Sequence, residues 1–156
     1  MASKLAMISL GACMALAPHA ALAAGAMDAP EAVKLDPDYA AGKAAIDARN
    51  WGAAIKSLTI AAQRDPNNAD IQNFLGYANR KLGQLDLAFK YYGRALEIDP
   101  KHRGAHEYVG EAYLMANNLA KAEEHLAALD KICFLPCEEY TDLKNEVAEY
   151  KLKNKK

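Results

Sequence analysis

ADIQNFLGYANRKLGQLDLAFKYYGRALEIDPKH, the segment from Ala69 to His102, decides the fold because it contains two amphipathic helix patterns. The first pattern repeats apolar side chains at the spacing i, i+3, i+4, i+7 and i+11, which follows one face of a helix. Its members are Ile71, Phe74, Leu75, Ala78 and Leu82. A second stripe consists of Ala88, Tyr92 and Ala95. The segment therefore predicts two helices that pack against each other as a hairpin.

Small residues predict how closely the two helices of this hairpin approach. Gly76 and Ala88 lie on the facing sides, where a missing or short side chain lets the backbones come together despite the low helix propensity of glycine. Pro100 ends the second helix, because proline disfavours helical geometry in the preceding residue and has no N–H to donate. A large residue in place of Gly76 should separate the pair.

The same pattern recurs at a period of 34 residues on both sides of this segment. A shift of one period aligns three glycines, three alanines and two further apolar sets without a gap. These sets are Gly42, Gly76 and Gly110; Ala54, Ala88 and Ala122; Leu58, Tyr92 and Leu126; and Ala61, Ala95 and Leu129. Pro66 and Pro100 also lie one period apart, whereas Phe134 takes the corresponding place in the third copy. The chain therefore predicts an array of three similar units.

Residues 35–134 resemble the tetratricopeptide repeat, a helix-turn-helix unit of 34 residues. The pattern of this family has a small residue at its eighth position and alanine at its twentieth, and the three glycines and the first set of alanines supply them. The resemblance implies an all-α fold, a right-handed α-solenoid of three helix-turn-helix repeats at about 35–68, 69–102 and 103–134. The end of the third repeat departs from the pattern, because Phe134 replaces the proline.

The periodicity predicts six repeat helices and a seventh helix after them. The expected ranges are 37–49, 51–64, 69–82, 85–98, 103–116, 119–132 and 137–152. The seventh carries one apolar stripe, which consists of Tyr140, Leu143, Val147 and Tyr150. A helix that covers the exposed end of a solenoid needs such a stripe. Residues 135–156 are therefore predicted to be a C-terminal capping helix with a basic tail.

Residues 1–23 predict a signal peptide for export. They combine a positively charged start, an apolar stretch over residues 5–17 and a small-residue cleavage site that ends at Ala23, with cleavage after Ala26 as the alternative. Residues 24–35 are predicted to be a flexible leader, because they have no sustained apolar period. We expect a protein with these features to be exported to the bacterial periplasm. The alternative is a lipoprotein anchored through Cys13, which follows a short lipoprotein-like sequence.

The charge balance and the motifs exclude several classes of function. The chain has 19 Lys and Arg against 20 Asp and Glu, so it lacks the basic excess that nucleic acid binding requires. Its longest apolar run is shorter than the roughly 18 residues of a membrane span, so no transmembrane segment is predicted in the mature chain. It contains no Gly-rich phosphate loop, nucleophile elbow or paired-carboxylate cleft. The sequence therefore predicts no enzyme activity, no catalytic residue, no cofactor and no metal site.

The resemblance implies that five positions in the first helix of each repeat face a concave groove. Transferred by position, they are Asp36, Tyr39, Lys43, Ile46, Asp47, Asp70, Asn73, Tyr77, Arg80, Lys81, Gly104, Glu107, Glu111, Leu114 and Met115. The residues predicted to bind a partner are Tyr39, Lys43, Asn73, Tyr77, Arg80, Lys81, Glu107 and Glu111. The basic members form a positive patch beside the tyrosines and the two glutamates form an acidic patch, which suits an extended peptide. The alternative is that these residues are ordinary solvated helix faces.

Cysteines and histidines form two further sets that could carry chemistry. Cys133 and Cys137 predict a disulfide that fixes the cap to the array in an oxidising compartment. The alternative is a redox or metal-binding pair, because Cys137 begins the seventh helix, where a thiolate is stabilised. His102 and His106 are four residues apart, and His125 follows. We interpret these histidines as packing residues, because His102 is expected to precede its helix.

The function predicted from these features is a non-enzymatic protein-protein interaction module, a scaffold or adaptor of the bacterial cell envelope. It would bind a peptide or protein segment in its concave groove. The alternative function is a thiol redox or metal-handling periplasmic protein that uses Cys133 and Cys137. Self-association is a further partner prediction, because the ends and grooves of solenoids can stack on one another.

Overall fold

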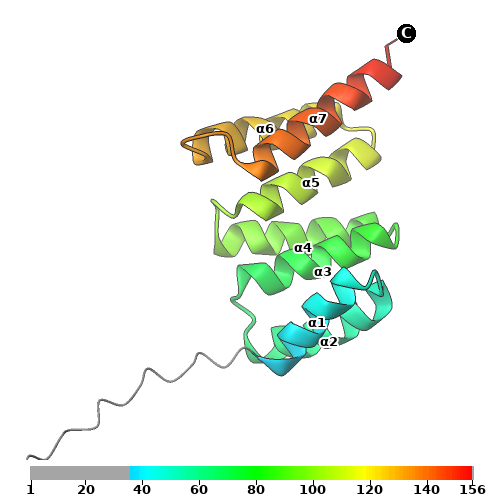
Figure 1. The fold of residues 1–156 in the computed structure, drawn as a ribbon, viewed down its shortest axis with the longest axis vertical. Coiled ribbons are helices and arrows are strands. Elements are labelled where there is room, and N and C mark those ends of the chain that lie inside the picture. The colour runs from blue at the N-terminus through cyan, green and yellow to red at the C-terminus, as the bar shows by residue number, and fades with distance from the viewer. Residues whose placement is uncertain (1–35, 156) are drawn as a thin grey trace, which may run out of the picture. The chain divides into compact units, whose positions relative to one another are not determined.

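A computed structural model describes residues 36–155. These residues form seven helices, with no strand in this part of the chain. The helices are α1 (Pro37–Asp47), α2 (Trp51–Arg64), α3 (Ala69–Lys81), α4 (Leu85–Ile98), α5 (Arg103–Met115), α6 (Leu119–Ile132) and α7 (Glu138–Lys153). Figure 1 shows the hairpins α1–α2, α3–α4 and α5–α6 stacked one above the next, with α7 beside α6. The predicted all-α solenoid is confirmed.

Three predictions from the sequence fall outside the described residues. They are the signal peptide over residues 1–23, the leader over residues 24–35 and the alternative lipid anchor at Cys13. Within residues 36–155, no helix is both long enough and apolar enough to cross a membrane.

Five of the seven described helices, α1, α2, α3, α5 and α6, begin where a capping side chain accepts a hydrogen bond from a first-turn N–H group. Asn50, Asn68 and Asn118 each accept from the backbone N–H three residues later, at 3.2 Å. Asp36 accepts from Asp38 and Tyr39 at the start of α1. All seven observed helix starts agree with the predicted starts to within one residue, and these caps fix the starts of five of them.

The first helix of each repeat ends earlier than the periodicity predicts, and the turns show why. Arg49, Gly83 and Asn117 have positive φ angles of 55°, 75° and 57°, and each lies two residues after its helix ends. This left-handed conformation stops the helix and recurs once per 34-residue period. Only the middle turn uses glycine, the residue that adopts this conformation at no steric cost.

Close packing within the hairpins follows from the glycines, as predicted. A Cβ atom added to Gly42 would lie 2.5 Å from Cγ of Leu58, and one added to Gly76 would lie 2.6 Å from the ring of Tyr92. Both partners belong to the second helix of the same repeat and are fully buried. A larger residue at either glycine would therefore push the two helices apart.

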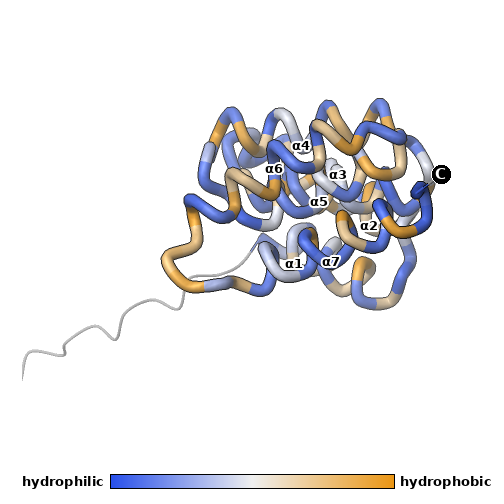
Figure 2. The backbone as a smooth tube through the Cα atoms, turned by 90° about the horizontal axis from the view of Figure 1, so that it is seen from above, coloured by the Kyte–Doolittle hydropathy of each residue, from blue (hydrophilic) through white to orange (hydrophobic). Residues whose placement is uncertain are grey.

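Helix α7 packs against both α5 and α6 and covers the end of the array. Its residues Leu143 and Val147 are buried in a cluster with Ala122 and Leu129 of α6. The loop between α6 and α7 protrudes from the array, and Figure 2 shows its hydrophobic colour. Phe134, which replaces the expected proline, is 101% exposed at this loop. The apolar loop is therefore separate from the core that α7 completes.

Candidate functional site

A row of aromatic side chains connects the three repeats and is the centre of the candidate site. Tyr77 of α3 has its ring centroid 5.8 Å from that of Trp51 and 4.8 Å from that of Tyr108 on α5. The ring of Tyr108 in turn lies 6.5 Å from that of Tyr92. We call these four residues the aromatic row. Trp51 and Tyr108 thus both contact the ring of Tyr77. Because Tyr77 is only half-buried, part of its side chain still faces solvent.

Two exposed lysines, one on α1 and one on α3, lie against aromatic rings of these two helices. The Lys81 ammonium is 5.2 Å from the centroid of Tyr77. The Lys43 ammonium is 5.4 Å from the centroid of Phe74 and 5.9 Å from that of Tyr39. The ring centroids of Tyr39 and Phe74 are 6.2 Å apart. Each predicted lysine thus belongs to a cation and aromatic pair, which offers a partner both charge and apolar area.

Arg80 is placed differently from the two lysines. Its side chain is only 5% exposed, its Nη1 is paired with the Glu111 carboxylate, and its Nε donates to the Tyr92 hydroxyl at 3.3 Å. Burial lowers the pKa of Arg80, but Tyr92 and Glu111 raise it further than burial lowers it. Arg80 and Glu111, expected on separate patches of opposite charge, therefore form one ion pair between α3 and α5. Arg80 also lies 5.2 Å from Tyr77, so it supports the aromatic row.

Asn73 and Glu107, two more predicted residues, line a pocket between the starts of α3, α5 and α7. Asn73 is 3% exposed and Glu107 is 9% exposed. Burial raises the pKa of Glu107 to about 8, and repulsion from Glu111 and Asp142 adds to the effect. The predicted residues therefore divide among an aromatic surface, the Arg80–Glu111 ion pair and an acidic pocket that adjoins the aromatic row at Tyr108.

Tyr108 and Trp51 belong to the aromatic row but were not among the predicted contacts. Tyr108 follows Tyr77 by 31 residues, and Glu111 follows Arg80 by the same separation. A residue of α3 therefore contacts a residue of α5 that lies about one helical turn before its counterpart in the 34-residue alignment. An alignment shifted by one helical turn would have paired both sets.

The cysteine and histidine pairs occupy their own places in the structure. The sulfur atoms of Cys133 and Cys137 lie 2.09 Å apart, at disulfide bonding distance. His102 caps α5, whereas His106 pairs with His125 at 2.9 Å between their Nδ1 atoms. Burial, followed by the neighbouring His106, lowers the pKa of His125 to about 4. In the part of the chain that the structure covers, no three His, Cys, Asp or Glu residues cluster as a metal site would require.

Family models described as tetratricopeptide repeat match this chain twice. One covers residues 39–103 and the other covers residues 79–132. Together they span the six helices of the three hairpins. A human relative, Protein O-mannosyl-transferase TMTC3, is 31% identical over 75 residues. That match covers 48% of this chain and only 8% of the length of the human protein.

Solved structures show the same fold in proteins of distant sequence. The type III secretion translocator chaperone SycD of Yersinia enterocolitica has a TM-score of 0.69 and 21% identity, covering 76% of this chain and 92% of that one. The same chaperone in complex with a peptide of the translocator YopD has a TM-score of 0.65 and 21% identity, over the same shares. The TPR2B domain of yeast Sti1, solved in a complex with pHsp70, has a TM-score of 0.65 and 19% identity, covering 75% of this chain and 95% of that one.

Proposed function

Because the chain belongs to the tetratricopeptide repeat family, we propose that it is a non-enzymatic module that binds an extended segment of a protein partner along α1, α3 and α5. One observation carries this proposal. Tyr77 is fixed between Trp51 and Tyr108, remains half-exposed and has the exposed Lys81 over its ring. A rigid aromatic ring beside a cation is typical of residues that dominate binding energy at protein interfaces.

The packing of the aromatic row favours binding because the site is already ordered. Trp51 and Tyr108 restrain the ring of Tyr77, so little side-chain entropy remains to be lost when a partner arrives. Arg80 contributes to this order indirectly, because its ion pair with Glu111 links α3 to α5 beside the Tyr77 ring. In this proposal the partner contacts Tyr39, Lys43, Tyr77 and Lys81. The ion pair between Arg80 and Glu111 stabilises the arrangement of the helices that carry them.

Relatives of the same fold support this mode of action. SycD has been solved with a peptide of YopD, and the yeast Sti1 domain has been solved in a complex with pHsp70. Their identity to this chain is too low to carry over either partner. We transfer only the general mode, the binding of a segment of another protein.

Cross-linking from the aromatic row tests the proposal. A photoreactive phenylalanine analogue in place of Tyr77 should capture a partner in cells, and changing Lys43→Glu with Lys81→Glu should reduce capture at least about tenfold. The matched control changes Lys56→Glu with Lys131→Glu, two exposed lysines of α2 and α6. Equal capture by both double variants would show that the binding surface lies elsewhere.

The location proposed for this module is the bacterial cell envelope. Support comes from the sequence of residues 1–23, which has the three parts of a signal peptide. Expression of the full chain followed by periplasmic extraction and N-terminal sequencing tests this. We expect a periplasmic chain that begins just after Ala23. An unprocessed chain in the cytoplasm would contradict the proposed location but not the proposed binding surface.

A further inference from the structure

A pocket of about 350 Å³ lies where the first turns of α3, α5 and α7 meet. Five acidic side chains contribute to its lining, together with one amide and two aromatic rings. The acidic residues and the amide are Asp70, Glu107, Glu138, Glu139, Asp142 and Asn73. Among residues 36–155, the one basic side chain in this lining is that of His102. The lining of the pocket is therefore rich in acidic side chains.

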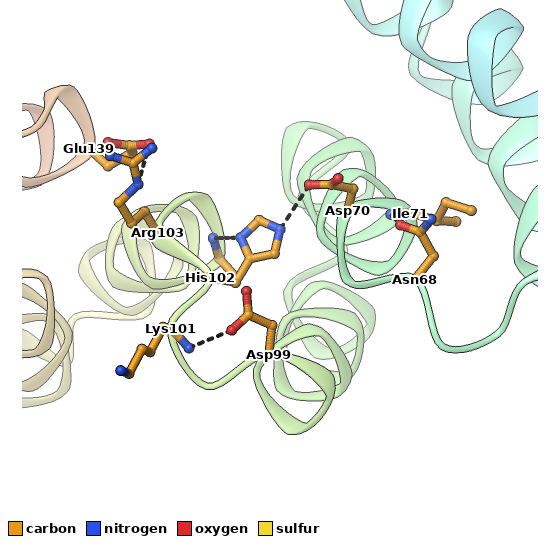
Figure 3. Close-up of polar contacts among 9 residues, drawn as sticks. Asn68, Asp70, Ile71, Asp99, Lys101, His102, Arg103 and Glu139 are labelled. Carbon is orange, nitrogen blue, oxygen red and sulfur yellow. Dashed lines mark hydrogen bonds and ion pairs between the residues drawn. The ribbon is translucent and has the colours of Figure 1, made fainter. Parts of the chain in front are cut away.

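Figure 3 shows the rim of this pocket, where two of the acidic residues already have partners. Nδ1 of His102 accepts from the Ala105 N–H at 3.1 Å, so its Nε2 donates to Asp70, also at 3.1 Å. The Arg103 guanidinium lies 3.5 Å from the Glu139 carboxylate. Asp70, Glu138 and Glu139 also belong to first turns of their helices, where negative charge is favourable. Helix stability thus accounts for these three carboxylates.

Helix stability does not account for three polar groups one turn further along these helices, of which two are buried and Asp142 is exposed. Asn73, Glu107 and Asp142 are each the fifth residue of their helix, in α3, α5 and α7 respectively. The buried Oδ1 of Asn73 has no hydrogen-bond donor, and Glu107 is buried without an ion pair among the described residues. Such groups lower stability unless something satisfies them. A ligand with several donors and a positive charge would do so.

We propose that this pocket binds the guanidinium group of an arginine side chain carried by the partner segment. The Asn73 amide oxygen, the carbonyl oxygen of the Glu107 carboxyl group and the Asp142 carboxylate supply acceptors, while Phe74 and Tyr108 supply aromatic faces. A planar guanidinium with five N–H donors can use acceptors spread around a pocket and also stack on rings. This inference rests on the proposed function and adds the chemistry by which a partner segment is selected.

The dispersion of the carboxylates favours an organic cation over a metal ion. A divalent cation needs several oxygen ligands within about 2.0–2.6 Å of one point. No such cluster of three or more side chains exists in residues 36–155. An arginine side chain instead spans the distance between acceptors on different helices.

A pair of short peptides tests this inference on the full chain. Acetyl-Gly-Arg-Gly-amide is titrated against acetyl-Gly-citrulline-Gly-amide, in which the same side chain carries no charge. We expect the arginine peptide to shift the NMR signals of the Asn73 amide group and of Glu107, with the citrulline peptide at least about tenfold weaker. Equal binding of both peptides, or binding of CaCl₂ at these signals without the arginine peptide, would overturn the inference.

Two double variants test which residues hold the arginine. Glu107→Gln with Asp142→Asn should weaken binding of the arginine peptide about tenfold or more, whereas Asp86→Asn with Asp130→Asn replaces two exposed acidic side chains of α4 and α6 and should leave the affinity unchanged. Unchanged affinity in the first variant, with normal helix content, would contradict the assignment. If cross-linking from Tyr77 succeeds while the arginine peptide does not bind, only the pocket assignment fails. If the peptide binds but Tyr77 captures nothing, the pocket stands and the proposed binding surface fails.

Discussion

The middle hairpin, α3–α4, and the third hairpin, α5–α6, close against different partners. In the middle hairpin the small residue Gly76 faces Tyr92 of the same repeat. In the third, the equivalent Gly110 faces Leu143 of α7, with a Cβ position 2.6 Å from Cδ2 of that leucine. The glycine of the middle hairpin thus packs within its own repeat, whereas the glycine of the third packs against a helix outside the repeats.

This difference explains why α7 belongs to the core of the folded array. Leu143 is fully buried, and Tyr150 of α7 donates to the Asn117 side chain at 3.3 Å in the turn between α5 and α6. A repeat at the end of a solenoid has no following repeat to cover it. In this protein α7 takes that place and also supplies three residues to the acidic pocket.

The largest expected effect comes from truncating the two large partners of these glycines. Tyr92→Ala should lower the free energy of unfolding by about 4 kcal/mol and Leu143→Ala by about 3 kcal/mol, because each leaves a cavity in a buried cluster. Urea unfolding followed by circular dichroism measures both. Lys144→Ala, at an exposed position of α7, serves as the control. If Leu143→Ala behaved like that control, α7 would be a dispensable tail.

A smaller effect distinguishes the two glycines themselves. Gly76→Ala should cost about 2 kcal/mol, because its new methyl group meets the rigid ring of Tyr92. Gly110→Ala should cost about 1 kcal/mol, since the flexible end of Leu143 can shift. At Gly93, with no atom within 4 Å of the added Cβ, alanine should instead stabilise by about 0.5 to 1 kcal/mol. Equal costs at Gly76 and Gly110 would remove the distinction drawn between the hairpins.

The fifth residue of α3 and of α5 predicts a contrast in pH dependence. Asn73 does not titrate, whereas the pKa of Glu107 is raised from 4.5 to about 8 in the folded chain. The folded chain therefore keeps a proton that the unfolded chain releases, and this contribution to stability, complete below pH 4.5, is lost as the pH rises to about 8.

Thermal unfolding of Glu107→Gln measures this loss. Relative to the unaltered chain, the variant should gain stability between pH 5.5 and pH 7.5, by about 2.5 kcal/mol from the two pKa values alone and by about 1.5 kcal/mol after allowance for solvent screening. His125, with its pKa lowered to about 4, acts in the opposite direction at acidic pH, but it is present in both chains and cancels. Glu149→Gln, at an exposed position of α7, should follow the unaltered chain. Parallel curves for Glu107→Gln and the unaltered chain would contradict a raised pKa.

The smallest expected effect concerns the Cys133 and Cys137 pair. If the disulfide forms, the mass of the non-reduced chain is lower by two hydrogen atoms. Cys133→Ser with Cys137→Ser should then lower stability by only about 1 kcal/mol, because the closed loop is short. In this variant the rate of backbone hydrogen exchange should increase more in α7 than in α3. Stoichiometric metal on the purified chain, or a readily reduced disulfide, would favour the redox or metal-handling alternative.

The period of the sequence was enough to predict the helices and the hairpins. A glycine, an alanine and a large apolar residue at fixed spacing define two helices that must pack closely, so their positions follow from the residues alone. The left-handed turns could not be predicted in the same way. Arg49, Gly83 and Asn117 share one backbone conformation but no common side-chain chemistry.

The contacts between repeats were also beyond the sequence. Positional alignment placed Arg80 and Glu111 on separate patches, because the shift of one turn between α3 and α5 arises only when the hairpins stack. Similarly, the sequence predicted Glu107 as a charge on a helix surface, whereas in the structure it lies beside α7 and is buried. Burial by a distant segment is what turned an expected surface residue into part of a pocket.

Tyr108 belongs to both the aromatic row and the acidic pocket. A single partner segment that places an apolar side chain against Tyr77 and an arginine in the pocket would therefore make a bivalent contact. Once the first side chain is bound, the second meets its site at a high effective concentration, so two weak interactions combine into a much stronger one. Selectivity would then depend on the spacing of the two side chains in the partner as much as on their identity.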